Sequence, residues 1–205
     1  MGFYNTRIVP RIINCGCGTP AFGETRTRVL GGLTGEVLEI GFGTGHNLAH
    51  YPPSVSRIHA VEPSARSIEL AAERIAASSA EVVVSGDDAQ QLALADESFA
   101  TVVSTWSLCT IPDPDAAMAE IVRVLKPGGR FHFVEHGKSP DAKVARRQRR
   151  FEPMWRRMSG NCHITRNIDD IVRSSGLEMV SLNTFAHPKD FKVMNWTFEG
   201  VAVRR

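Results

Sequence analysis

The most constraining feature of the sequence is an apolar run that leads directly into a cluster of glycines. Residues 37–45 read VLEIGFGTG, and a helical pattern begins at His46. A strand, a tight turn and a helix start in this order form the βα unit of an α/β protein, whose turn presents backbone N–H groups to a ligand. The sequence therefore predicts a ligand-binding turn, although glycines also serve close packing in purely structural turns.

The charge around this turn indicates which ligand it favours. Glu39 lies just before the first glycine, and His46 stands where a dinucleotide fingerprint would have another glycine. A carboxylate here repels a pyrophosphate and attracts a ligand that carries an ammonium and a sulfonium. We therefore expect S-adenosylmethionine rather than NAD. The predicted contacts in the turn are Glu39, Gly41, Gly43, Thr44 and Gly45.

Polar residues follow the other predicted strands at the same edge of the sheet. Strand 57–61 ends in Glu62-Pro63, 21 positions after Gly41, where a carboxylate can accept both hydroxyls of a ribose. A short polar side chain after strand 81–84 could bind an adenine amino group. The carboxyl ends of parallel strands meet at one edge, so we expect one site there. Its further members are Asp88, Ala89, Thr105, Trp106 and His136.

The alternation of patterns predicts an open, mostly parallel sheet with helices on both faces. Apolar stripes at helical spacing occur between the strands, and two closing strands complete the sheet. The predicted strands are 37–40, 57–61, 81–84, 99–104, 130–136, 177–185 and 191–203; the predicted helices are 24–30, 46–51, 64–76, 112–125, 143–157 and 167–174, with Thr165 as the cap of the last. A helical spacing in 3–14 is broken by Pro10.

Composition fits one domain of 205 residues, and a net charge of +2 requires no polyanionic partner. The N-terminus lacks the apolar run of a signal peptide, so we expect a cytoplasmic protein that is a monomer or a homodimer. The four cysteines, Cys15, Cys17, Cys109 and Cys162, are expected as free thiols. We expect no metal site, because the adjacent Cys162 and His163 have poor chelating geometry and no C-x-x-C pair is present.

Two segments flank the predicted site. Residues 1–33 form an N-terminal helical cap, which either covers a sheet edge or serves as a flap whose Tyr4, Asn14 and Cys15 face the ligand. Residues 137–163 form a lid with a basic helix at 143–157, kinked at Pro153. This helix is either a solvated lid, a weak contact for anionic membrane or substrate, or a nucleic-acid surface. We expect no nucleic-acid partner, because no aromatic stacking platform is evident.

The motifs resemble those of class I S-adenosylmethionine-dependent methyltransferases. The turn at 39–45 is similar to their E/D-x-G-x-G-x-G loop, and LKPGG at 125–129 resembles a turn of UbiE-type (methyltransferase domain 11) enzymes. Asp88-Ala89 and the segment 96–99 are similar to their G-D-A…D-x-S-F segment, although Asp87 stands in place of a glycine. A narrower resemblance is to the methyltransferase-like 7 group and its bacterial relatives. It rests on Asn47 with Tyr51-Pro52-Pro53, Leu108-Cys109, Glu135-His136, Pro153-x-Trp155 and Cys162-x-Ile164-Thr165-Arg166.

The resemblance implies a Rossmann-like seven-stranded sheet whose last strand is antiparallel. It also implies a cofactor-binding role for Asn47 and methylation of alkyl thiols, as in the animal members of the narrower group. The chain departs from those members because the apolar N-terminal anchor is absent, so membrane attachment does not carry over. Its N-terminal segment also differs, which leaves the choice of substrate open.

Methyl transfer from a sulfonium is a direct displacement, which orientation accelerates. A thiol acceptor needs little help to become a thiolate, whereas a phenol needs a base. His136 is the candidate base or thiolate partner, unless it only packs against the loop, and His163 is the second choice. We expect a small, apolar acceptor beside Trp106 in a pocket formed by Tyr4, Asn14, Leu108, Cys109, Trp155 and Cys162. The alternatives are O- or C-methylation of a phenol or quinol, or a non-catalytic protein that binds the cofactor or docks on membranes.

Overall fold

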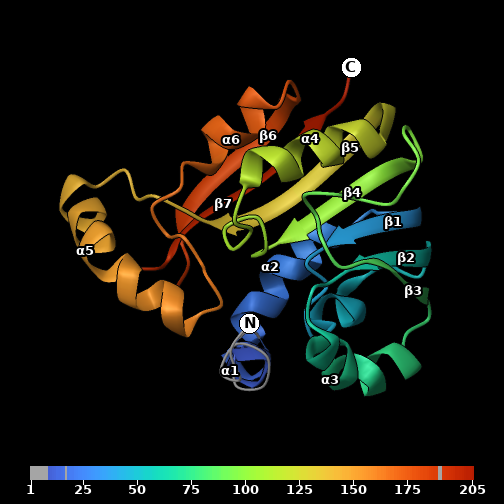
Figure 1. Ribbon diagram of the computed structural model, residues 1–205, viewed down its shortest axis with the longest axis horizontal. Coiled ribbons are helices and arrows are strands. Elements are labelled where there is room, and N and C mark those ends of the chain that lie inside the picture. The colour runs from blue at the N-terminus through green and yellow to red at the C-terminus, as the bar shows by residue number, and fades with distance from the viewer. Residues whose placement is uncertain (1–8, 17, 189–190) are drawn as a thin grey trace.

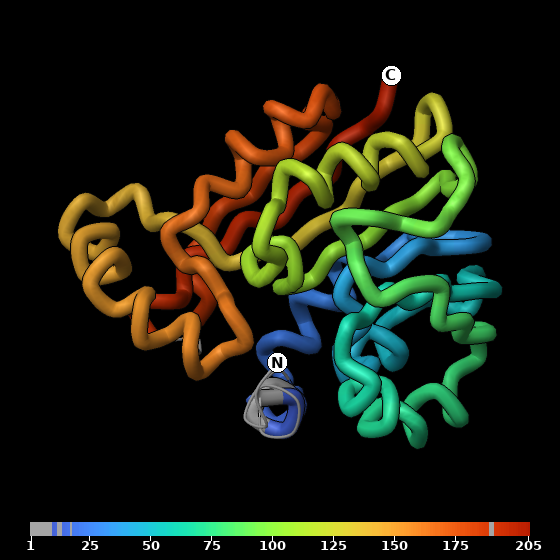
Figure 2. The backbone as a smooth tube through the Cα atoms, in the orientation of Figure 1, coloured from blue at the N-terminus to red at the C-terminus, as the bar shows by residue number. Residues whose placement is uncertain are grey.

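The computed structural model describes residues 9–16, 18–188 and 191–205 (Figure 1). Its centre is one seven-stranded sheet in the order β3-β2-β1-β4-β5-β7-β6. Neighbouring strands from β3 to β5 are parallel, whereas β7 runs antiparallel to both β5 and β6. In Figure 2 the red end of the chain, which contains β7, lies beside the yellow β5. The strands are β1 (Gly35–Ile40), β2 (Val55–Val61), β3 (Glu81–Gly86), β4 (Phe99–Thr105), β5 (Leu125–His136), β6 (Glu178–Ala186) and β7 (Trp196–Val203).

Helices cover both faces of the sheet because neighbouring strand residues point to opposite sides. Leu38 belongs to a buried cluster with residues of α4 (Pro114–Val124) and α6 (Ile168–Ser174). Val37 belongs to another cluster, together with residues of α2 (Pro20–Leu30), the 3₁₀-helix η2 (His46–His50) and α3 (Ala65–Ala76). In Figure 1, α4 and α6 lie in front of the sheet. The predicted α/β architecture, with its antiparallel last strand, is therefore confirmed.

Strand register brings the ends of three strands to one level. Ile40, the last residue of β1, lies opposite Val61 of β2 and Ser104 of β4. The chain leaves each of these strands at the same edge, so the turns that follow must lie close together. The glycine turn, the segment after Glu62 and the segment after Thr105 meet there as the sequence predicts.

The N-terminal segment contains α1 (Val9–Gly16) and α2. Pro10 lies in the first turn of α1 rather than breaking the helix, because a proline there removes an N–H that would have no helical partner. Tyr4 lies outside the described residues.

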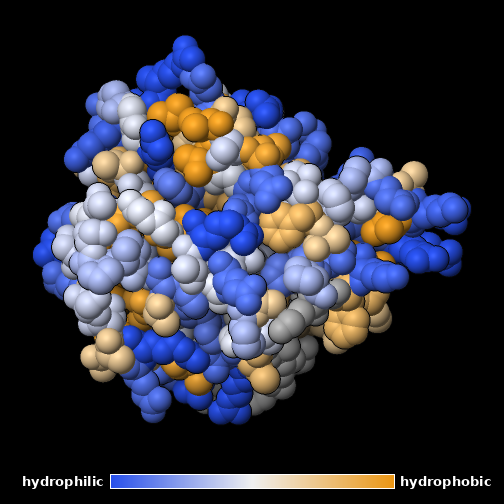
Figure 3. All heavy atoms as spheres, turned by 180° about the vertical axis from the view of Figure 1, so that it is seen from behind, coloured by the Kyte–Doolittle hydropathy of each residue, from blue (hydrophilic) through white to orange (hydrophobic). Residues whose placement is uncertain are grey.

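The basic helix α5 (Ala142–Met158) projects from one end of the sheet (Figure 1). The carboxylate of Asp141 caps it by accepting hydrogen bonds from the backbone N–H groups of Lys143 and Val144. Phe151 and Trp155 pack on a small buried cluster formed by Cys109, Cys162, Ile164 and Met194. Seen from behind, the projecting end is dominated by hydrophilic residues (Figure 3). None of the described helices has both the length and the apolarity that a bilayer span requires.

Several predicted boundaries are wrong; α2, for example, begins at Pro20 rather than at residue 24. The Thr165 N–H donates to the Glu152 carboxylate at 2.7 Å, so Thr165 does not cap α6, which begins after Asn167. The last strand begins at Trp196 rather than at residue 191, where Phe191 is 79% exposed. β5 already begins at Leu125, because the LKPGG turn forms a bulge within the pairing with β4.

Candidate active site

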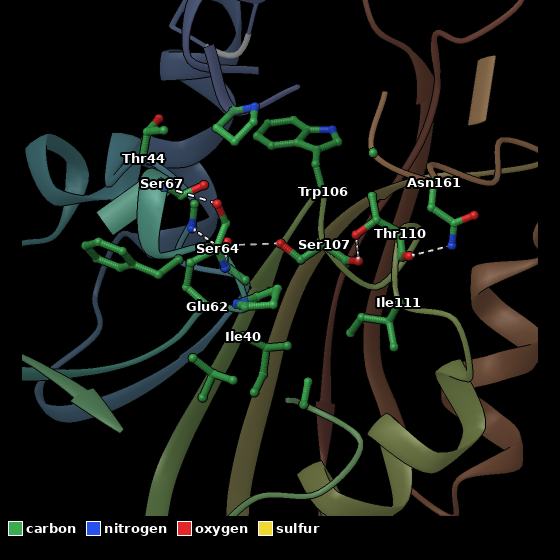
Figure 4. A pocket seen from close by; sticks show the side chains of 18 of the residues that line it. Ile40, Thr44, Glu62, Ser64, Ser67, Trp106, Ser107, Thr110, Ile111 and Asn161 are labelled. Carbon is green, nitrogen blue, oxygen red and sulfur yellow. Dashed lines mark hydrogen bonds between the residues drawn. The ribbon is translucent and has the colours of Figure 1, made fainter. Parts of the chain in front are cut away.

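The carboxyl edge of the sheet opens into a cleft of about 1710 Å³. This volume exceeds the several hundred Å³ of an ordinary small-ligand pocket and leaves room for two ligands side by side. Figure 4 shows its wall from Glu62 past Trp106 and Ser107 to Asn161. Most of the predicted cofactor residues line it: Glu39, Gly41, Gly43, Thr44, Asn47, Glu62, Pro63, Asp88, Ala89, Thr105 and Trp106. The remaining one, Gly45, packs against Ala71 and Leu48 below the turn.

Gly41 and Gly43 of the turn have different structural roles. Gly41 has a φ of +72°, and a Cβ added there would lie 2.1 Å from the Ser107 Oγ, which donates to the Gly41 carbonyl. Gly43 has a φ of +59°, but an added Cβ would meet only the Gly41 carbonyl at 3.9 Å. Gly41 is therefore required by protein packing, whereas Gly43 leaves the backbone open to a ligand in the cleft.

Glu62 binds the glycine turn from the neighbouring strand. Its carboxylate accepts hydrogen bonds from the backbone N–H of Gly43 at 2.8 Å and from that of Ser64 at 3.0 Å. Burial raises the pKa of Glu62, and these backbone hydrogen bonds oppose the rise. A carboxylate has about four acceptor positions, so Glu62 can hold the turn and still accept hydroxyl groups from the cleft.

Glu39 is the most deeply buried charge of the cleft, with 1% of its surface exposed. It accepts hydrogen bonds from the Asn47 side-chain amide and from the Tyr51 hydroxyl, both at 2.8 Å. Burial raises the pKa of Glu39 to about 7. The Asn47 amide also donates to the Thr105 Oγ1 at 3.0 Å, so one network joins the ends of β1 and β4.

Arg26 completes this network, and sequence reasoning missed it. Its Nε donates to the Asn47 Oδ1 at 3.0 Å, and its guanidinium lies 4.9 Å from the centre of the Trp106 ring. The side chain lines the cleft although the residue is only 5% exposed. A signal was present, since an arginine between Phe22 and Val29 interrupts an apolar helix face.

Trp106 forms the wall between the two halves of the cleft. Its φ of +52° is unusual for a residue with a side chain, and such strain gathers at functional sites. Phe22 holds the ring in an edge contact with 4.7 Å between centroids. The Trp106 Nε1 and the Thr44 Oγ1 are both buried without a hydrogen-bond partner among the described residues.

Glu135 braces the wall from behind and was also missed as a functional residue. It is fully buried and accepts from the Ser104 hydroxyl at 2.6 Å and from the backbone N–H groups of residues 107, 108 and 109 at 3.0–3.1 Å. Burial raises its pKa despite these bonds. The sequence contains a signal for this role, because Glu135 directly follows the apolar Phe133 and Val134, and a buried charge there needs partners.

The predicted acceptor pocket is not formed as expected. Leu108 and Cys109 are fully buried because Glu135 holds their backbone inward, and Trp155 and Cys162 pack together behind the cleft. The backbone carbonyl of Asn14 lies 3.0 Å from the His46 Nε2, and Asn14 does not appear in the cleft wall. The far end of the cleft is lined instead by Thr110, Ile111, Pro112, Pro153, Arg156, Arg157, Ser159, Gly160 and Asn161. This end is more polar and basic than the sequence predicts.

The two candidate catalytic histidines lie behind the same wall. The ring of His136 is 6.2 Å from that of Trp106, and its Nδ1 is 3.8 Å from the Cys162 sulfur. The His163 Nδ1 is 3.8 Å from a Glu152 oxygen, and burial lowers the pKa of His163. Neither side chain lines the cleft.

Comparison with known proteins gives two kinds of match. Residues 38–133 match the family described as a methyltransferase domain. The chain is 37% identical over 151 residues to thiol S-methyltransferase TMT1B of Rattus norvegicus, which covers 67% of this chain and 58% of that protein. It is 31% identical over 121 residues to a demethylmenaquinone methyltransferase of Clavibacter sepedonicus, covering 58% of this chain and 49% of that protein. The chain thus spans less than two thirds of either relative.

A solved structure extends the likeness over the whole fold. The N-methyltransferase NodS from Bradyrhizobium japonicum WM9, in complex with S-adenosyl-L-homocysteine, matches with a TM-score of 0.68. The match covers 98% of this chain and 94% of that chain at 19% identity. At this identity it shows a shared fold alone.

Proposed function

The chain carries a methyltransferase domain in the class I fold of the S-adenosylmethionine-dependent methyltransferases, as its motifs predict, and from this premise we propose that it methylates a small-molecule acceptor, with a thiol favoured. One observation carries the proposal. A buried carboxylate, Glu39, and a half-buried one, Glu62, flank a glycine turn whose backbone is open at Gly43. This charge suits a cationic ligand that also has hydroxyl groups.

The residues of the cleft fit S-adenosylmethionine. Glu62 accepts the ribose hydroxyls, and the segment at Asp88 and Ala89 holds the adenine end. Glu39 and Asn47 supply negative and polar groups near the glycine turn, and Arg26 supplies a positive group for a carboxylate. Two buried polar atoms without partners among the described residues, Thr44 Oγ1 and Trp106 Nε1, remain for a ligand. When bound, the cofactor supplies an electrophilic methyl group on a sulfonium.

The protein's own contribution is to orient the acceptor and to exclude water. Fixing two reactants in line can contribute up to about 7–11 kcal/mol in well-ordered systems. Trp106, held by Phe22 and Arg26, forms a rigid wall at the point where the two halves of the cleft meet. The proposed cap, 1–33, and lid, 137–163, contribute Pro10 and Pro153 to the cleft wall, which supports their role in covering the site.

A thiol is the favoured acceptor because its pKa near 8.5 makes a thiolate available without a strong base. The TMT1B relative, a thiol S-methyltransferase, supports this choice. His136 is the proposed thiolate partner, with His163 second. Among the described residues neither histidine lines the cleft, which favours an acceptor that needs little proton transfer. A small acceptor, at least partly apolar, fits beside Trp106 and Ile111.

The test is formation of S-adenosylhomocysteine by the purified protein, with a small alkyl thiol and a matched phenol assayed side by side. Turnover of the thiol alone is the expected result. Turnover of the phenol alone would refute the thiol assignment and leave the cofactor assignment intact. Cofactor binding without turnover of either compound would refute both acceptors.

O- or C-methylation of a phenol or quinol is the second candidate. The demethylmenaquinone methyltransferase relative and the large cleft favour it. A base is essential for a phenol and not for a thiol, so His136→Asn should abolish phenol turnover and spare most thiol turnover if both occur.

A non-catalytic role in cofactor binding or membrane docking is the third candidate. On α5 the basic residues at 146, 147, 149 and 150 are exposed, as are Met154 and Met158. Salt-sensitive binding to anionic vesicles without any turnover would support it. A cytoplasmic monomer or homodimer without a nucleic-acid partner stays our prediction.

A further inference from the structure

Three potential metal ligands gather behind the wall of the cleft. Cys109 lies in the turn after β4, His136 ends β5, and Cys162 follows α5. The two sulfur atoms are 3.6 Å apart, and the His136 Nδ1 is 3.8 Å from the Cys162 sulfur. The three ligand atoms all lie within 4.8 Å of one another, and both cysteines are buried.

We propose that Cys109, His136 and Cys162 together bind one zinc ion. Zinc bonds of about 2.3 Å to sulfur and about 2.0 Å to nitrogen, at tetrahedral angles, place two sulfurs about 3.8 Å apart and a sulfur and a nitrogen about 3.5 Å apart. The two observed spacings differ from these values by about 0.2 Å and about 0.3 Å. The third spacing, between the Cys109 sulfur and the His136 ring nitrogen, is at most 4.8 Å, so side-chain rotations that shorten it would complete the site.

The charge of the ligand set favours zinc over other thiophilic ions. Two thiolates and a neutral imidazole balance a doubly charged cation, which is the arrangement that a buried site tolerates best. A copper(I) ion with the same ligands would leave a buried net negative charge. Three protein ligands leave one position open, as in zinc sites that bind an additional small ligand.

These three ligands differ from the set that the sequence suggests, in which His163 would be the nitrogen ligand beside Cys162. Cys15 is exposed on α1, and the His163 imidazole faces Glu152 rather than the sulfurs. The expectation of no metal site was based on the adjacent Cys162 and His163. His136, which is 26 residues away from Cys162 in the sequence, supplies the better-placed nitrogen.

A zinc ion at this place would fasten two loops that line the cleft. The His163 backbone N–H already donates to the Cys109 carbonyl at 2.8 Å, and the Asn161 side chain donates to the Thr110 carbonyl at 3.0 Å (Figure 4). Thr110 and Asn161 both line the acceptor end of the cleft. The ion would hold this end in one shape whether or not methyl transfer is the reaction, so the inference does not depend on the proposed function. Zinc on the His136 Nδ1 would leave only the Nε2 of that ring for the thiolate role proposed above.

Metal content of the purified full-length protein tests the proposal directly. We expect about one zinc per chain by plasma mass spectrometry, with stoichiometric zinc retained in Cys15→Ser and lost in both Cys109→Ser and Cys162→Ser. Protein without zinc, protein with copper in its place, or undiminished zinc in Cys162→Ser would overturn it.

A second measurement covers the case in which the serine variants fail to fold. Wild-type protein is treated with a chelator under reducing conditions and titrated with cobalt(II), whose bonds to thiolates give an intense near-ultraviolet absorption. Saturation at one cobalt per chain, reversed by zinc and unchanged in Cys15→Ser, is the expected result. A reduced, folded protein without this absorption would overturn the proposal, as would a native disulfide between Cys109 and Cys162.

Discussion

Replacement of Glu39 by glutamine should remove a loss of stability that the ligand-free protein undergoes as the pH rises. Glu39 is buried, and burial raises its pKa from an ordinary value of 4.5 to about 7. In the unfolded chain the carboxyl loses its proton near pH 4.5, whereas in the folded protein it keeps the proton until about pH 7. Between these values the folded state binds more protons than the unfolded state, so stability falls as the pH rises.

The size of the effect follows from the same two values. A rise in pKa from 4.5 to about 7 corresponds to a free-energy cost of about 3 kcal/mol once the group is ionised. Most of that cost develops between pH 5 and pH 8.5, where we expect a change of about 2–3 kcal/mol. Glutamine has no charge to bury, so Glu39→Gln should lack this dependence.

The assay is urea unfolding of wild type and Glu39→Gln at pH 5 and pH 8.5, without cofactor. Glutamine hydrogen-bonds to Asn47 and Tyr51 less well than a carboxyl group does. This lowers the free energy of unfolding of Glu39→Gln by the same amount at both pH values. The matched control is Glu73→Gln, which changes an exposed carboxylate on α3 and should follow the wild type. If the difference between wild type and Glu39→Gln is the same at both pH values, the argument from burial is refuted.

Three further substitutions test the cleft. Glu62→Ala removes the acceptor of the Gly43 N–H and should weaken S-adenosylhomocysteine binding about 10–100-fold by calorimetry; unchanged affinity would remove Glu62 from the site. Gly43→Ala and Gly128→Ala both place alanine at positive φ with open space around the Cβ, so their unfolding free energies should fall by a similar amount of about 1–2 kcal/mol. Cofactor affinity should fall only in Gly43→Ala. An equal loss of cofactor affinity in Gly128→Ala would contradict the assignment of Gly43 to the cofactor site. Gly41→Ala should lower the melting temperature more than Gly128→Ala does, because its Cβ would collide with Ser107, and equal temperatures would disprove that contact.

The fold and the cofactor half of the site were predictable because they depend on short stretches of sequence. Each strand, turn and helix start is encoded within about ten residues, and parallel pairing brings the strand ends to one edge. Glu39, Gly43 and Glu62 follow directly from this rule, and register places them together as expected.

The acceptor half was not predictable because it depends on contacts between distant segments. The hydrogen bonds of Glu135 span 26 to 31 residues, and the contact between Cys109 and Cys162 spans 53. No local pattern shows that Leu108 turns inward while Asn161 lines the cleft. Likewise, the sequence marks α2 as a helix but does not show that Arg26 faces Trp106.

The cost of burying Glu39 is itself an argument about the ligand. A glutamine or a methionine at this position would pack in a similar volume without a desolvation cost, and a fold gains nothing from a carboxylate that weakens it at neutral pH. The cost is offset when a cation binds nearby, because the opposite charge favours the ionised carboxylate. The ammonium group of S-adenosylmethionine is such a cation, and binding should lower the pKa of Glu39 and release about one proton or less per cofactor at pH 6. Calorimetry in buffers of different ionisation enthalpy measures that proton release. If no proton is released, the carboxylate of Glu39 does not serve to bind the ammonium group.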